Sequence, residues 1–197
     1  PNKTLLTYSI LTWNVRGMGT ARWRYSVQTY LKRRGTDIAL IQESHITHTE
    51  VARLQRRWRG QLFSTTYSAF ARGALIWIRA GVPFRVEAQI IDIEGRFVLL
   101  RGHLDGSQIV LGSIYAPNTD LQPFFSQLSL HLAPWSHLPW LLGGDFISFL
   151  DPVLDGSFLP FDQAPTLNQA QRFRFGEGRC WKKGAARVVV AGGGGRR

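Results

Sequence analysis

The chain has 197 residues, of which 44% are hydrophobic and 12% aromatic, enough for one domain with a sizeable core. Its formal net charge is +11, but residues 171–197 hold eight basic residues and one acidic residue, which leaves +4 for residues 1–170. Bulk charge therefore favours a polyanionic partner only weakly. No apolar run approaches the roughly 18 residues of a membrane span, so we expect no membrane-spanning segment.

Cysteine usage and the first residues indicate the compartment. Cys180 is the single cysteine, which excludes an internal disulfide and is typical of a reducing compartment. Residues 1–20 lack the basic, apolar and small-residue pattern of a signal peptide, so we expect a nuclear or cytoplasmic protein. Because the chain begins at Pro1 and its one methionine is Met18, we also expect a fragment or a trimmed product.

The first 60 residues predict two strands and two helices in alternation. Two runs rich in apolar and β-branched residues predict the strands, and two segments with apolar residues at helical spacing predict the helices. The expected elements are a strand at residues 5–15, a helix at 21–34, a strand at 37–42 and a helix at 49–58. Gly35 is expected to end the first helix, and Thr47 or Thr49 to cap the second.

From residue 61 the hydrophobic pattern changes to a period of two, which predicts strands. The expected strands are residues 61–69, 73–79, 84–93, 96–103 and 108–115. Asp105-Gly106 lies between the last two and predicts a hairpin with a type I′ turn. We then expect a helix at residues 121–132, which Pro134 closes, and a buried strand from Trp140 to Asp145.

The C-terminal segment lacks a regular pattern. Residues 171–197 combine glycine, arginine and alanine, a composition that buries too little apolar surface to offset its ordering entropy. We therefore expect a domain at residues 1–160 and a disordered basic tail at residues 161–197. Residues 187–191 are the only strand-like run in the tail. A tail that grips phosphates is the alternative, although the irregular composition favours out-of-frame sequence.

Polar side chains follow four of the predicted strands at the point where each strand ends. They are Asn14, then Glu43 with Ser44 and His45, then Tyr115 to Asn118, and finally Asp145. Strand ends at one edge of packed sheets can converge on one site, and oxygen ligands there suit Mg²⁺. Each residue alone also has an ordinary structural interpretation, such as a turn residue, a solvated carboxylate, a core aromatic or a helix cap.

Four motifs in this order resemble the endonuclease/exonuclease/phosphatase family, and within it the endonuclease domain of LINE-type (non-LTR) retrotransposons. The motifs are LTWNVRG at residues 11–17, IALIQESH at 38–45, GSIYAPN at 112–118 and GGDF at 143–146. The resemblance implies an α+β fold, a four-layer α/β/β/α sandwich whose second sheet is incomplete here. It also implies hydrolysis of phosphodiester bonds in DNA, and intact relatives in which this domain begins a larger polyprotein with reverse transcriptase.

The resemblance also implies roles by position. Glu43 would hold Mg²⁺, with Mn²⁺ as the alternative ion, and Asn14 would orient the metal or the scissile phosphate. Tyr115 would place its hydroxyl near the phosphate, and Asp145 would orient or deprotonate the attacking water. The expected catalytic set is Asn14, Tyr115, Asn118 and Asp145, and the expected phosphate or DNA contacts are Asn14, Arg16, His45 and Asn118.

Two departures from the family predict an inactive or impaired copy. Ile147 stands where the family has an asparagine that donates to the phosphate, and losing one such donor typically costs on the order of 10²–10³ in rate. The family ends with a Ser-Asp-His triplet, whereas no histidine follows His137 here and the last aspartate is Asp162. The alternatives are an abasic-site nuclease or a phosphatase of the same family, or a non-catalytic remnant that binds nucleic acid.

Overall fold

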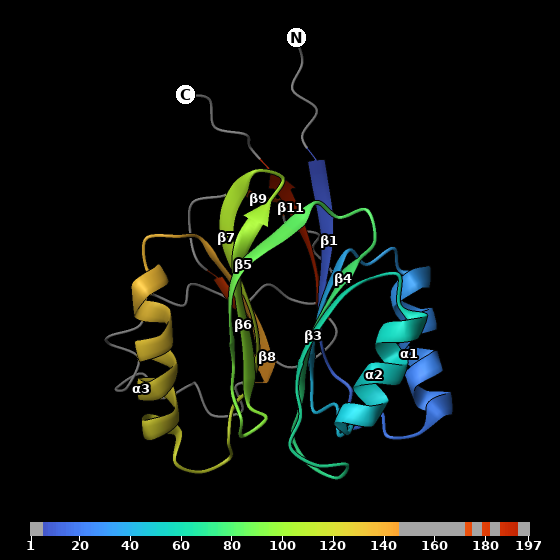
Figure 1. Ribbon diagram of the computed structural model, residues 1–197. Coiled ribbons are helices and arrows are strands. Elements are labelled where there is room, and N and C mark those ends of the chain that lie inside the picture. Colours follow the sequence, from blue (N-terminus) through green and yellow to red (C-terminus); the bar gives the residue numbers. More distant parts are fainter. Residues whose placement is uncertain (1–5, 146–171, 175–178, 182–185, 193–197) are drawn as a thin grey trace.

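The structure, a computed structural model, describes residues 6–145, 172–174, 179–181 and 186–192. Two β-sheets lie face to face between outer helices (Figure 1). Helices α1 (Ala21–Arg33) and α2 (His48–Arg57) cover one sheet, and α3 (Leu121–Leu132) covers the other. This arrangement confirms the predicted α+β fold, a four-layer α/β/β/α sandwich.

The first sheet has the strand order β3-β4-β2-β1-β11-β9. Its strands are β1 (Leu6–Asn14), β2 (Ile38–Gln42), β3 (Gly60–Thr65), β4 (Ala74–Arg79), β9 (Arg172–Arg174) and β11 (Ala186–Gly192). Strands β1 and β2 run parallel, and Asn14 pairs with Gln42 at their carboxyl ends. The strand expected at residues 61–69 ends at Thr65, because the chain leaves β4 after Thr65 pairs with Ala74.

The second sheet has the strand order β10-β8-β7-β6-β5. Its strands are β5 (Phe84–Ile91), β6 (Phe97–Leu104), β7 (Ser107–Tyr115), β8 (Trp140–Asp145) and β10 (Arg179–Trp181). Strands β7 and β8 run parallel, with Tyr115 paired to Asp145 at their ends. Asp105 and Gly106 have φ values of 52° and 78°, as a type I′ turn between β6 and β7 requires.

Alternation along the strands builds the core in three layers. On β2, Ile38 and Leu40 face the second sheet, while Ala39 and Ile41 face α1 and α2. On β7, Leu111 belongs to the central layer between the sheets and the neighbouring Val110 and Ile114 pack toward α3. Because both faces of each sheet are covered, these strands are continuously apolar in their centres. Among the described residues, no helix has the length and apolar character needed to cross a membrane.

Three strands come from the segment for which the sequence predicts disorder. Strand β11 pairs antiparallel with β1, β9 pairs parallel with β11, and β10 pairs parallel with β8. The structure differs here from the expectation because a strand edge is completed by backbone groups, and such pairing needs no side-chain period. The domain boundary at residue 160 and the expected incompleteness of the second sheet fall on residues outside the described ranges, and both stay predictions.

Candidate functional site

The parallel ends of β1 and β2 bring an amide against a carboxylate. Asn14 Nδ2 donates to Glu43 Oε1 at 2.8 Å, while Asn14 Oδ1 accepts from the backbone N–H of Arg16 at 3.0 Å. The side chain of Glu43 is only 18% exposed, and its Oε2 atom lies 3.9 Å from His45 Nε2. The carboxylate is therefore held in one orientation at the edge of the sheet.

The loops that carry these residues are joined by backbone hydrogen bonds. Arg16, Glu43 and His45 all have positive φ values, of 50°, 51° and 49°. Gly17 N donates to Glu43 O at 2.6 Å, and His45 N donates to Arg72 O at 2.9 Å. Non-glycine residues in this region of backbone space are uncommon and gather at functional sites, where the surrounding structure holds them in place.

The second sheet contributes the ends of β7 and β8. Tyr115 is the last residue of β7, and its backbone N–H donates to Arg96 O at 2.7 Å. The register of the parallel pair sets Asp145 beside Tyr115 along the backbone. Strand ends from both sheets thus reach the same edge of the sandwich, as the sequence predicts.

An open pocket of about 380 Å³ lies over this edge. It is lined by Glu43, His45, Phe70, Ala71, Arg72, Arg96, Tyr115, Pro117, Asn118 and Thr119. Four of the predicted site residues therefore line one pocket, and Asn14 reaches it through its hydrogen bond to Glu43. Arg16 lies on the adjacent loop outside the lining set, and Asp145 is placed here by its backbone alone. Ile147 and Asp162 lie outside the described residues.

Sequence reasoning missed Phe70, Arg72 and Arg96, which also line the pocket. Phe70 and Arg72 lie on the loop between β3 and β4, and Arg96 precedes β6. None of them follows a strand that ends at the site, so the strand-end argument passed over them. A weak signal was present in residues 67–72, where two aromatic residues and one arginine lie at or just after the end of a predicted strand, since aromatic and basic side chains together can contact nucleic acid.

Two of the three residues that the sequence argument missed are arginines. Arg72 Nη1 donates to Glu94 Oε2 at 2.6 Å. Burial lowers the pKa of Arg96, and the charge of Arg72 lowers it further, while Tyr115, Asp92 and Glu94 act in the opposite direction. The guanidinium group of Arg96 remains charged near neutral pH, because the ordinary pKa of arginine lies far above it. The pocket lining therefore combines two arginines with the carboxylate of Glu43.

A buried polar network joins the two sheets beneath the site. Gln42 Nε2 lies 3.1 Å from Ser113 Oγ on β7, 3.3 Å from Thr12 Oγ1 on β1 and 3.4 Å from the Gly143 carbonyl on β8. Ser113 Oγ in turn donates to Ile41 O at 2.8 Å. Gln42 and Ser113 are fully buried. Because a buried network of this kind tolerates little displacement, it fixes how the two halves of the site face each other.

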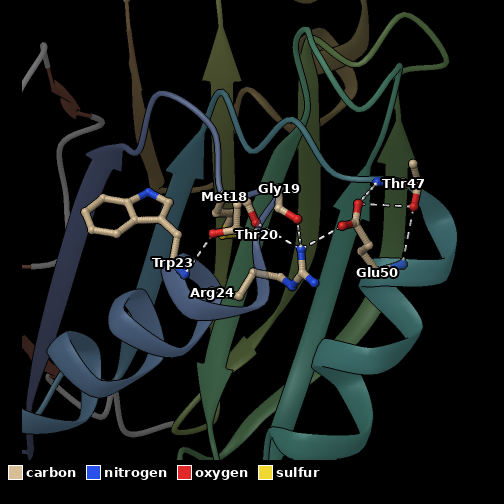
Figure 2. A network of polar contacts seen from close by, with 7 residues as sticks. All are labelled: Met18, Gly19, Thr20, Trp23, Arg24, Thr47 and Glu50. Carbon is tan, nitrogen blue, oxygen red and sulfur yellow. Dashed lines mark hydrogen bonds and ion pairs between the residues drawn. The ribbon is translucent and has the colours of Figure 1, made fainter.

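A second network connects α1 with α2. Figure 2 shows Arg24 on α1 reaching Glu50 on α2 and the carbonyl groups of Met18 and Gly19. Arg24 Nη1 lies 2.7 Å from Glu50 Oε1, and Glu50 also completes a capping box with Thr47. The network ties the loop after β1 to the start of α2, and so supports the loops that hold the Asn14–Glu43 pair.

The donors at this edge fit Mg²⁺ better than Zn²⁺. Within the described residues, no group of three or more histidine, cysteine, aspartate or glutamate side chains is gathered to hold a metal. Mg²⁺ retains several waters and is commonly bound through one or two carboxylates, whereas structural Zn²⁺ takes four nitrogen or sulfur ligands. The carboxylate of Glu43, oriented by Asn14 and open to the pocket, meets the first description.

No protein-family model matches the chain. The chain is 27% identical over 149 residues to a Xenopus laevis protein named "Transposon TX1 uncharacterized 149 kDa protein". This match covers 74% of the chain and 11% of that protein. The chain therefore spans about a tenth of the length of this curated relative.

Solved structures share the fold. The AP endonuclease LMAP from Leishmania major has a TM-score of 0.54 at 18% identity, covering 71% of this chain and 55% of that one. The endonuclease domain of TRAS1, a telomere-specific non-LTR retrotransposon, has a TM-score of 0.51 at 16% identity, covering 70% and 58%. An endonuclease/exonuclease/phosphatase from Bacteroides vulgatus has a TM-score of 0.56 at 14% identity, covering 72% and 66%. The chain has the endonuclease/exonuclease/phosphatase fold, as the motifs predict.

Proposed function

We propose that this chain is a DNA-nicking phosphodiesterase of retrotransposon descent that depends on a divalent cation, and that this copy is impaired. The observation that carries the proposal is the convergence of Asn14, Glu43 and Tyr115 on one open pocket at parallel strand ends of both sheets. The likeness to TX1 and TRAS1 supports a transposon origin. The length of the TX1 protein supports a polyprotein in intact relatives.

The chemistry we propose follows from the residues at the pocket. Glu43, oriented by Asn14, would hold Mg²⁺ or Mn²⁺, and Asn118 would support the loop beside the phosphate. A bound divalent ion would supply positive charge that stabilises the phosphoryl oxygens in the transition state. The hydroxyl of Tyr115 would donate a hydrogen bond to an oxygen of the same phosphate.

Hydrolysis requires a base for the attacking water. Asp145 would take a proton from the water as its oxygen bonds to phosphorus. The phosphorus–oxygen bond to the leaving strand breaks in the same displacement, and the leaving oxygen takes a proton from solvent. The backbone of Asp145 lies next to Tyr115, which supports a shared task at one phosphate.

The proposed impairment rests on the sequence. Ile147 cannot donate a hydrogen bond where the resemblance implies an asparagine, and no histidine follows His137. Loss of one such donor typically lowers the rate by on the order of 10²–10³. We therefore expect nicking to be slow and to increase when the donor is restored.

A plasmid-nicking assay with Mg²⁺ tests the proposal. We expect the unaltered chain to nick supercoiled DNA slowly, and Ile147→Asn to raise the rate by on the order of 10²-fold. Glu43→Ala should reduce both rates to background, because it removes the carboxylate proposed to hold the ion. Glu87→Ala serves as the matched control, since Glu87 is an acidic residue on β5 outside the pocket lining.

Two results would contradict the proposal in different ways. Rapid nicking by the unaltered chain, abolished by Glu43→Ala, would show that the site is intact and that the impairment is wrong. Nicking that survives Glu43→Ala would show that the pocket is not the active site. The same assay on an abasic duplex tests the alternative substrate, which the likeness to an AP endonuclease supports.

A further inference from the structure

One feature of the pocket has no part in the proposed hydrolysis. Phe70 lines the pocket and is 89% exposed. Isolated apolar residues are common on protein surfaces, but Phe70 shares its loop with Tyr67, which is 53% exposed. An accessible aromatic side chain in the lining of this pocket, with a second one on the same loop, offers a contact surface for a flat ligand.

The loop that carries Phe70 is held in place. Arg72 Cζ lies 4.1 Å from the ring centroid of Tyr67, and Arg72 also bonds to Glu94 on the loop between β5 and β6. Gly73 N donates to Gly95 O at 2.9 Å. A Cβ at Gly95 would lie 2.8 Å from Tyr67 Cβ, so the two loops touch closely. Phe70 is therefore exposed on a loop that these contacts hold in place.

Two arginines line the same pocket as Phe70. Arg72 and Arg96 both line the pocket, and the charge of Arg72 lowers the pKa of Arg96. The nearby carboxylate of Asp92 accepts from the backbone N–H of Arg96 at 2.8 Å. A phosphate in this pocket can accept hydrogen bonds from these arginines, because its geometry matches that of arginine donors.

We propose that Phe70, Arg72 and Arg96 form a nucleotide subsite next to the cleavage site, in which the arginines hold a phosphate and Phe70 stacks on an unpaired base. The inference rests on the proposed function for its choice of DNA. Both faces of a base within an intact duplex are covered by its neighbours, so the ring of Phe70 stacks most readily on a base that is unpaired or single-stranded. The substrate class is accordingly DNA that is locally unpaired at the cut.

The pocket lining favours a nucleotide over an apolar protein segment. Two arginines, Asn118 and Thr119 supply charged and polar groups around a single exposed ring. A volume of about 380 Å³ lies within the range of pockets that accept small organic ligands. A nucleotide matches this lining: its phosphate is an anion, its sugar carries polar groups, and its base has a flat face.

Binding of labelled oligonucleotides in a chelator, without divalent ions, tests the subsite apart from catalysis. The probes are a single strand, a blunt duplex and a strand of equal length made of abasic spacers. We expect Phe70→Ala to weaken binding of the single strand by roughly 5- to 150-fold, the usual effect of removing one stacking aromatic. The abasic strand and the duplex should bind equally to both forms, and Phe70→Trp should retain affinity for the single strand.

The arginines give a separate readout. Arg96→Ala should weaken the binding of both the ordinary and the abasic single strand. It should also reduce the magnitude of the slope of log affinity against log salt by about 0.7, as expected for one lost phosphate contact. Phe70→Ala should leave that slope unchanged. Arg85→Ala is the matched control, because Arg85 is an exposed arginine on β5 outside the pocket. Circular dichroism of each variant confirms that the fold is retained.

The outcomes separate this inference from the proposed function. If Phe70→Ala leaves the affinity for the single strand unchanged, or lowers the affinity for the abasic strand equally, the proposed base stacking is wrong. The proposed nicking activity is not affected by that result. If the unaltered chain prefers the duplex, the assignment of unpaired DNA is wrong. If it binds none of the three probes, the subsite is wrong, and the nicking assay with Mg²⁺ decides the proposed function separately.

Discussion

At Gly143 the missing side chain is a packing requirement. A Cβ there would lie 2.7 Å from both Leu40 Cδ1 and Thr12 Oγ1, which belong to the opposite sheet. Real Cβ atoms essentially never approach other atoms so closely. The glycine therefore lets β8 pack against β1 and β2 directly beneath the candidate site.

We expect Gly143→Ala to lower the free energy of unfolding by about 1–3 kcal/mol, the usual cost of overpacking a core. Urea denaturation at neutral pH measures the change. Gly19→Ala is the matched control, because a Cβ at Gly19 would meet only His45 O, at 3.6 Å. That control should stay within about 0.5 kcal/mol of the unaltered chain. Equal stability of the two variants would contradict the close approach at Gly143.

Backbone conformation marks the same region at the residue scale. Arg16, Glu43, His45 and Arg72 all have positive φ values and lie at the loops around the pocket. Such conformations cost of order 1–3 kcal/mol each and persist where the surrounding structure imposes them. Their concentration here supports the choice of this edge as the functional one.

At the scale of elements, α2 begins with a capping box whose glutamate also forms an ion pair with an arginine of α1. Thr47 N donates to Glu50 Oε2 at 2.9 Å, and Arg24 Nη1 contacts Glu50 Oε1 (Figure 2). Burial acts to raise the pKa of Glu50, but the hydrogen bonds from Thr47 and the charge of Arg24 outweigh it, so the pKa falls below its ordinary value of 4.5. The ionised form of Glu50 therefore stabilises the folded state.

We expect Glu50→Gln to lower the free energy of unfolding by about 1–2 kcal/mol at neutral pH, because it keeps a capping side chain but removes the charge pair with Arg24. The contribution of Glu50 is fully present above its unfolded pKa and is lost as the pH falls through the lower folded pKa. The difference from the unaltered chain should thus be constant above about pH 4.5 and shrink below it. Urea unfolding between pH 3 and pH 7 measures this, and a difference that ignores pH would contradict it.

At the scale of the whole molecule, the site depends on how the two sheets are registered. Glu43 comes from the first sheet and Tyr115 from the second, so neither sheet builds the pocket alone. The contact from Gln42 Nε2 to Ser113 Oγ crosses the interface at 3.1 Å, one residue before Glu43. A buried polar link between otherwise apolar faces fixes their relative position.

A double-mutant cycle tests that link. Gln42→Met and Ser113→Ala should each lower the free energy of unfolding by about 1–3 kcal/mol, because each leaves a buried polar group without its partner. The double variant should cost less than the sum of the two, with a coupling of about 0.5–3 kcal/mol. Urea unfolding of all four forms gives the coupling. Strict additivity would show that the two side chains act independently.

Much of the fold could be predicted because its signals are local. The apolar run before Glu43, the helical spacing in residues 21–34 and the Asp105-Gly106 turn each depend on a few neighbouring residues. The strand pairings of residues 172–192 could not be predicted in this way. They depend on free backbone edges at β1 and β8, which exist only once those sheets have formed.

The sequence by itself determined the strand ends that carry Asn14, Glu43, Tyr115 and Asp145, because each is marked by a local pattern of apolar residues followed by glycine or polar residues. Only the tertiary structure decided that Glu43, His45, Tyr115 and Asn118 line one pocket, and that Phe70, Arg72 and Arg96 line it too. The physical reason is that Phe70, Arg72 and Arg96 lie on loops whose positions depend on contacts between segments far apart in sequence. Arg72 meets Glu94, and Gly73 bonds to Gly95, only after the two sheets have packed.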